Sequence, residues 1–298
     1  MQRSLAPRGL LQARTGLKAF VKRARASYIR TFHSFGRAEL AHVLNRVGLR
    51  QGDSTLVHSS FDAFEGFEGK PSDVIEVLQE AVGPHGLLMM PTIPFSGTAI
   101  DWVRSNPLVD LRRTPSRMGL ISEIFRRSPN VIRSVHPTHP VAAWGAQAAA
   151  CIEGHPLART PCGVGSPYHD LLTRDGSVLL LGVDVNAITL YHTAEELLES
   201  QLRVSPLTRD TFRLECVAPD GRIAVIETRL FEPAVSRRRN LDRLVPELKH
   251  RRAWREAKVG RLSVVLISAR QIIDAVAALA SQGINCYDES PQHEKSGA

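Results

Sequence analysis

The sequence has no long apolar run, and this excludes an ordinary membrane-spanning helix. No stretch of the 298 residues reaches the roughly 18 apolar residues that a span requires. The longest candidates, Val178–Val183 and Leu262–Ser268, have the length of strands. The basic start of the chain has neither a continuous apolar core nor a small-residue cleavage site, so we expect no secretory signal and a cytoplasmic protein.

Cysteine is scarce, and its positions argue against a disulfide-stabilised protein and against a zinc-binding protein. The four cysteines are scattered and form no CxxC pair, so the sequence indicates neither a disulfide framework nor a zinc knuckle. A reducing compartment fits this pattern. Hydrophobic residues make up 43% of the chain and charged residues 23%, as is typical of a globular protein with its own core.

Acidic residues are absent before Glu39, whereas arginine and lysine are frequent there. A second basic cluster lies between residues 237 and 255, and the net charge is +8. A solvated surface or flexible tail is the ordinary interpretation, and binding to nucleic acid, anionic lipid or a phosphorylated ligand is the alternative. We treat residues 1–35 as a basic extension that can form an amphipathic helix for docking or dimerisation, or a transit peptide.

From Arg37 onwards, helical and strand periodicities alternate. Helical patterns cover residues 37–49, 71–83 and 116–128, strand patterns cover 54–60, 86–92 and 178–183, and a strand followed by a helix covers 259–283. Residues 212–229 predict a hairpin that turns at Pro219-Asp220-Gly221. The sequence therefore predicts a three-layer α/β/α fold with a mixed central sheet. We expect one domain with a smaller interlinked subdomain over residues 36–285, and a polar C-terminal tail over 286–298.

His192 follows the predicted strand and begins a predicted helix, with Thr189 as a suitable N-cap. The positive end of a helix dipole favours a neutral, basic imidazole. Glu195 lies one turn further on and can hydrogen-bond the ring, which leaves the other ring nitrogen free to accept a proton. The same spacing also fits a surface histidine beside solvated glutamates, so spacing alone leaves both interpretations open.

The segment "HPTHP" places His136 and His139 three residues apart. The motif HExxH is absent and no carboxylate stands at ligand spacing beside them. A metal-dependent hydrolase using His136, His139 and His192 therefore remains only an alternative. Pro137 and Pro140 fix an extended path that can line a narrow tunnel.

The segment "VHSS" ends a predicted strand with His58, Ser59 and Ser60. Two hydroxyls and nearby backbone N–H groups can hold a phosphate or an amide, and Lys70 can add charge. The P-loop pattern is not matched because Pro71 stands where serine or threonine is needed. The pattern G-x-S-x-G is also absent, so Ser59 is a weak candidate for a hydrolase nucleophile.

Together, long segments of the chain resemble the aminoglycoside 3-N-acetyltransferase family, in the family's order. "GDSTLVHSS" resembles its first core strand and turn, and "VIEVLQEAVGPHGLLMMPT" the helix and strand that follow. "PSRMGLISEIFRRSPNVIRSVHPTHPVAAWG" and "TPCGVGSPYHDLLTRDGSVLLLGVDVNAITLYHTAE" resemble two long signatures, the second ending in His, any two residues and Glu. "VGRLSVVLISARQIIDAVAAL" resembles the closing strand and helix, so the resemblance runs from Arg37 to Gly283.

The resemblance implies acetyl-coenzyme A-dependent transfer to an amine of an aminoglycoside or other amino sugar. By motif, His192 is the general base and Glu195 its partner, because a protonated amine is no nucleophile. Transfer is expected to be direct, with acetyl-coenzyme A as cosubstrate and no metal. The resemblance further implies that the coenzyme A site is lined by His58, Ser59, Ser60, Gly69, Lys70, His136, Thr138 and His139.

Three residues depart from the family's usual pattern, and they affect packing and the tunnel wall. Tyr191, Cys162 and Pro140 stand where members usually carry Leu, Phe and Ser. The basic chain suits a polycationic acceptor poorly, so we expect a less cationic amino sugar. We expect a small-molecule partner and no nucleic acid, and a homodimer is possible. The alternative from another class is a non-catalytic coenzyme A-binding protein tethered by its basic segments to membrane or nucleic acid.

Overall fold

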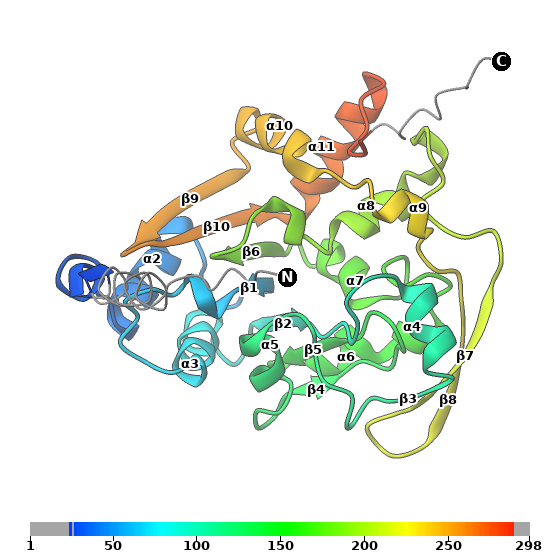
Figure 1. The fold of residues 1–298 in the computed structure, drawn as a ribbon, viewed down its shortest axis with the longest axis horizontal. Helices are drawn as coiled ribbons and strands as arrows, with labels where there is room; N and C mark the ends of the chain where they lie inside the picture. The colour runs from blue at the N-terminus through cyan, green and yellow to red at the C-terminus, as the bar shows by residue number, and fades with distance from the viewer. Residues whose placement is uncertain (1–23, 26, 289–298) are drawn as a thin grey trace, which may run out of the picture.

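The computed structural model describes residues 24–25 and 27–288, and at its centre is a seven-stranded mixed sheet (Figure 1). The strand order is β4-β5-β2-β1-β6-β10-β9. β1 (Ser54–Ser59) pairs in parallel with β2 (Leu87–Pro91) and with β6 (Ser177–Leu181). The other pairs are antiparallel and involve β4 (Ile132–Arg133), β5 (Val141–Trp144), β9 (Trp254–Val259) and β10 (Leu262–Ser268). The predicted α/β class with a mixed sheet is confirmed.

Alternate residues of the central strands face two different apolar clusters, as the period of a strand requires. In β2, Leu87 and Met89 belong to one cluster, and Leu88 and Met90 belong to the other. The first cluster includes residues of α6 (Ala148–Glu153), α7 (Pro167–Thr173), α8 (Tyr191–Leu197), α10 (Leu244–His250) and α11 (Ala269–Ser281). The second includes residues of α2 (Arg37–Val47), α3 (Pro71–Val82) and α5 (Leu120–Phe125). Helices therefore pack against both faces of the sheet.

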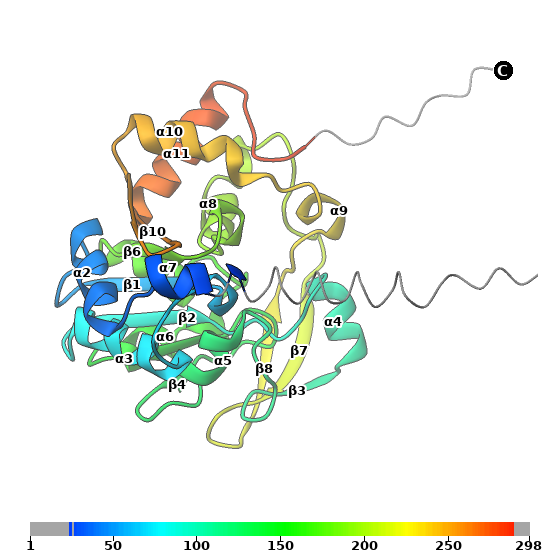
Figure 2. The same ribbon diagram turned by 60° about the vertical axis from the view of Figure 1, so that its left-hand side comes forward.

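A second, three-stranded sheet has the order β3-β7-β8. It consists of β3 (Leu108–Asp110) and the hairpin of β7 (Phe212–Val217) and β8 (Ile223–Thr228). The predicted hairpin is confirmed, and Gly221 adopts the positive φ of 87° in its turn. Figures 1 and 2 both show this sheet beside α4 (Ala99–Ser105), at one side of the molecule.

The ends of the packed chain differ from the predicted boundaries. Cys286 and Tyr287, assigned from the sequence to a polar tail, are each only 2% exposed. At the other end, residues 27–32 are helical and Phe35 is buried. Residues 1–23, 26 and 289–298, which make up most of the predicted extension and tail, lie outside the described part. Within the described residues, no helix is long and apolar enough to cross a membrane.

Candidate active site

His192 lies on the connection that leaves the carboxyl end of β6. The chain passes through a short 3-10 turn at Val185–Ala187 and then enters α8, in which His192 is the second residue. The N-cap is Leu190 rather than the predicted Thr189. The backbone N–H of Thr189 instead donates to Nε2 of His58 over 3.4 Å, which joins the start of α8 to the end of β1.

The predicted pair is formed, and it is not a solvated surface pair. Nδ1 of His192 and Oε2 of Glu195 are 2.6 Å apart. The side chain of Glu195 is 0% exposed and that of His192 is 13% exposed. Because the carboxylate can only accept, Nδ1 carries the proton and Nε2 is left with a lone pair.

Two residues that sequence reasoning missed complete the surroundings of Glu195. Tyr287 donates its hydroxyl to Oε1 of Glu195, and Nε and Nη2 of Arg239 each lie 3.3 Å from the same oxygen. Arg239 belongs to the basic cluster that the sequence suggested was solvated, and Tyr287 to the predicted polar tail. Both expectations are wrong for these two residues, because their side chains pack against a buried carboxylate.

The charges around the pair set the protonation of both members. Burial would raise the pKa of Glu195, but Arg239 and His192 outweigh burial and the pKa is lowered. Burial and the neighbouring guanidinium of Arg239 lower the pKa of His192, and Glu195 opposes them only in part. The pair is therefore a carboxylate beside a neutral imidazole at neutral pH.

His192 borders a pocket of about 320 Å³ at the carboxyl ends of β1, β2 and β6. Ligands of open α/β sheets bind at such strand ends. Arg117 and Arg239 also line the pocket, and among the described residues no aspartate or glutamate does. Arg117 is exposed, and its guanidinium has no hydrogen bond or ion pair to another described residue. The full lining consists of Val57, His58, Ser59, Pro91, Ile93, Arg117, Met118, Ser122, Val183, Asn186, Ala187, Ile188, Thr189, His192 and Arg239.

The "HPTHP" segment lies directly behind this pocket. The ring of His139 meets the ring of His192 edge-on at a centroid distance of 5.7 Å, and Phe231 packs on His192 at 3.9 Å. His136 and Thr138 are 0% exposed, and Nδ1 of His136 accepts the backbone N–H of Thr138. His139 therefore touches the candidate base, whereas His136 and Thr138 support the wall from inside the core.

The remaining predicted residues are not all brought to the pocket. His58 and Ser59 line it, and the next residue, Ser60, begins the 3-10 turn after β1 without belonging to the lining. Gly69 and Lys70 are exposed at the start of α3, where the backbone N–H of Lys70 donates to Asp73. Gly69 and Lys70 therefore stand apart from the residues around His192.

His136, His139 and His192 do not converge on one point as metal ligands would. His136 stacks instead on His155 at 4.6 Å, and the three predicted ligands meet through ring faces and edges. In the part of the chain that the structure describes, no three His, Cys, Asp or Glu side chains are grouped for a metal ion. The arrangement gives the hydrolase alternative no support.

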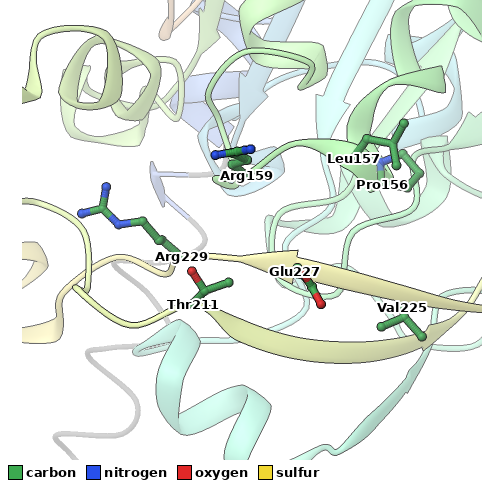
Figure 3. A pocket seen from close by; sticks show the side chains of 7 residues that line it. All are labelled: Pro156, Leu157, Arg159, Thr211, Val225, Glu227 and Arg229. Atoms are coloured by element: carbon green, nitrogen blue, oxygen red, sulfur yellow. The ribbon is translucent and has the colours of Figure 1, made fainter.

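The larger cavity of about 540 Å³ lies elsewhere, between the hairpin and the 3-10 turn His155–Leu157 (Figure 3). Pro156, Leu157 and Arg159 form one wall, and the other is formed by Thr211, Val225, Glu227 and Arg229. Neither His192 nor Glu195 lines it. We place the chemistry in the smaller pocket, because that pocket contains the perturbed histidine–carboxylate pair.

An α/β fold with a buried carboxylate–histidine pair at the carboxyl ends of parallel strands has the parts of an enzyme that uses a neutral imidazole as base. The family model "Aminoglycoside 3-N-acetyltransferase" matches residues 56–281, and the chain belongs to this family. The family consists of acyltransferases, so the chain is an acyltransferase, as the resemblance implied.

Individual relatives agree with this assignment. The chain is 33% identical over 241 residues to aminoglycoside N(3)-acetyltransferase IV of a Salmonella species, which covers 81% of the chain and 85% of the relative. The apoenzyme structure of aminoglycoside acetyltransferase AAC(3)-IVa is 29% identical, with a TM-score of 0.69 over 88% of this chain and 95% of that one. A mutant of that enzyme in complex with a gentamicin is 30% identical, with a TM-score of 0.66 over 84% and 90%.

Proposed function

We propose that the protein transfers the acetyl group of acetyl-coenzyme A directly to an amine of an aminoglycoside or other amino sugar, with His192 as general base. The observation that carries this proposal is the 2.6 Å hydrogen bond between His192 and the buried Glu195 at the edge of a pocket. Membership of the family supports the reaction class.

His192 takes the proton that the acceptor amine must lose. Glu195 accepts the proton on Nδ1 and so holds the ring in the tautomer whose Nε2 is basic. A positive charge that develops on the ring is stabilised by the adjacent carboxylate, whose lowered pKa keeps it ionised. A positioned base of this kind contributes roughly 10²- to 10⁴-fold to a rate.

The pocket beside His192 suits the anionic cosubstrate. Arg117 and Arg239 provide positive charge there, and the part of the chain that the structure describes contributes no carboxylate to the lining that would repel phosphate groups. The hydroxyl of Ser59 is available for polar contacts with the pantetheine arm or a phosphate. The acetyl group would then lie near Nε2 of His192.

The names of the relatives and the charge of this chain support the proposed acceptor class. The Salmonella relative is named for aminoglycosides, and a related structure holds a gentamicin. The net charge of +8 and a pocket lining without carboxylates favour an amino sugar with fewer positive charges than a typical aminoglycoside.

A thiol-release assay with acetyl-coenzyme A tests the proposal across a panel of aminoglycosides and amino sugars. We expect thiol release that depends on the acceptor, together with an acetylated product detected by mass spectrometry. The matched control is each acceptor with its amines already acetylated, which should release no thiol. A panel in which no free amine stimulates release would contradict the proposed function.

A further inference from the structure

Tyr287 lies beyond residue 281, where the match to the family model ends. It follows α11 and the turn at Gly283, whose φ is 75°. The segment Asn285–Asp288, here called the C-terminal strap, crosses behind α8, and its tyrosine is 2% exposed. A buried tyrosine hydroxyl needs a hydrogen-bond partner, and this one has found the carboxylate behind His192.

The two oxygens of Glu195 have different donors. Oε2 faces Nδ1 of His192, and Oε1 accepts from the hydroxyl of Tyr287. Arg239 lies further away, with Nη2 at 3.3 Å from Oε1 and 3.4 Å from Oε2. Bonds to charged acceptors are the stronger ones, and the contacts of Arg239 are at the long end of the range. Tyr287 is therefore the donor in closest contact with the oxygen that His192 does not use.

The strap is attached through the basic segment Arg238–Arg243. Nη1 of Arg243 donates to the backbone carbonyls of Asn285 and Tyr287, at 2.8 Å each. The N–H of Asn240 donates to the carbonyl of Cys286 at 2.8 Å, and the N–H of Asp288 to that of Arg238 at 2.7 Å. Arg239 and Tyr287 form an antiparallel bridge, so the two residues that contact Glu195 are held opposite one another.

We propose that Tyr287 is a positioning residue for acetyl transfer: its hydroxyl fixes Oε1 of Glu195, and the fixed carboxylate holds His192 in the tautomer and orientation that a base requires. The proposal rests on the proposed function of His192. It makes the C-terminal strap part of the active site, although the strap lies outside residues 56–281, which the family model matches.

Loss of the Tyr287 hydroxyl should shift the pKa of His192 in one direction. Glu195 would keep its charge but lose a donor, so it would attract a proton on His192 more strongly, and the pKa of His192 would rise. Arg239 is the cation that faces the pair, and the pKa of Glu196 is raised to about 8, mainly by burial. The other titratable groups around the pair are His139, Cys162, Tyr191 and Cys286.

The test compares Tyr287→Phe with Tyr191→Phe. Tyr191 is also buried and packs edge-on against Tyr287 at 6.4 Å, but its hydroxyl makes no hydrogen bond to Glu195 or His192. The titration of the His192 ring is followed by NMR, and kcat/KM is measured against pH. We expect Tyr287→Phe to move both midpoints upward and to lower kcat about tenfold, and Tyr191→Phe to leave both midpoints in place.

A second variant keeps the test decisive if Tyr287→Phe does not fold. Arg243→Gln removes the two bonds to strap carbonyls and the ion pair with Asp288, and it leaves Glu195 untouched, so it should move the His192 titration in the same direction by a smaller amount. The NMR titration needs no turnover, which separates failure of this proposal from failure of the proposed function. Unchanged His192 titration in Tyr287→Phe, or in Arg243→Gln where Tyr287→Phe does not fold, would overturn the role of Tyr287.

Discussion

At His192, burial and the guanidinium of Arg239 both disfavour the imidazolium, whereas Glu195 favours it. The net result is a pKa below the ordinary value of about 6.5. A base with such a pKa would remain deprotonated through neutral pH, and an enzyme that depends on it would lose activity only under acid conditions. The residue is therefore matched to the task of accepting a proton from an amine.

We predict that the acid limb of kcat/KM lies below pH 6.5 and moves upward in Arg239→Met. Removing the guanidinium removes a charge that opposes the imidazolium, so His192 would protonate at higher pH. The measurement is a pH profile at saturating acetyl-coenzyme A. Arg237→Met is the matched control, because Arg237 is exposed in the same segment and should leave the limb in place. If the acid limb of the pH profile of Arg239→Met is unchanged or lies at lower pH, Arg239 does not lower the pKa of His192.

Glu195→Gln should lower kcat by a factor on the order of 10² to 10⁴, because the amide neither carries the charge nor fixes the tautomer. Glu196→Gln is the matched control on the next residue. Burial raises the pKa of Glu196 to about 8, so a neutral amide resembles its state at pH 7 and should change kcat little. Single-turnover rates of both variants distinguish the two glutamates, and equal losses would show that Glu195 has no special role.

The sequence predicted half of this residue cluster. His192 and Glu195 are three positions apart on one helix, so local spacing and the family resemblance could identify them together. Arg239 and Tyr287 reach Glu195 from 44 and 92 positions away. Such contacts are created by the tertiary fold, and neither a basic cluster nor a lone tyrosine near the chain end carries a local signal for them.

At the scale of elements, strands buried on both faces were predictable and edge strands were not. β2 and β6 are nearly continuous apolar runs, as expected of parallel strands inside a sheet, and β1 is buried over Thr55–His58 although only Leu56 and Val57 in it are apolar. β9 has the sequence WREAKV and is largely exposed, which is how proteins protect a sheet edge. Its hydrogen bonds to β10, rather than its composition, make it a strand. The helix predicted over 116–128 is shorter than expected and begins only after Gly119, whose φ is 107°.

Gly145 directly follows β5, at a point where the backbone of Gly86 lies very close to it. Its φ is 116°, and an added Cβ would lie 2.1 Å from the carbonyl oxygen of Gly86. Gly145→Ala should lower the free energy of unfolding by more than about 2 kcal/mol.

Gly97→Ala is the matched control, because Gly97 has a similar φ of 105° and nothing within 4 Å of its added Cβ. Its cost should be confined to backbone strain of about 1 kcal/mol. Denaturant midpoints of the two variants measure the difference, and equal midpoints would show that the strand end can relax.

At the scale of the whole molecule, five histidines within the described residues have lowered pKa values, each with burial as the largest cause. They are His58, His136, His139, His155 and His192. The pKa falls to about 3 for His58 and to about 4 for His155. Unfolding exposes these rings and lets them bind protons, so the unfolded state gains stability as the pH falls below about 6.5.

We predict a steep loss of stability between pH 6.5 and pH 4. A histidine whose folded-state pKa lies below this window, such as His58 at about 3, removes about 1.4 kcal/mol of unfolding free energy per pH unit, and the losses of several histidines add. His155→Gln should flatten the pH dependence by about one proton, and exchange of the exposed His42 by Gln serves as the control. Thermal midpoints across this range provide the measurement, and an acid-insensitive midpoint would contradict the burial of neutral rings.

Replacement of His192 by Ala measures the central claim most directly. With the best acceptor from the panel, we expect kcat to fall by a factor on the order of 10² to 10⁴ while the Kd for coenzyme A changes by only a few-fold. His42→Ala, on the exposed face of α2, should behave like the wild type. If His192→Ala retains kcat within a few-fold of wild type, His192 is not the base.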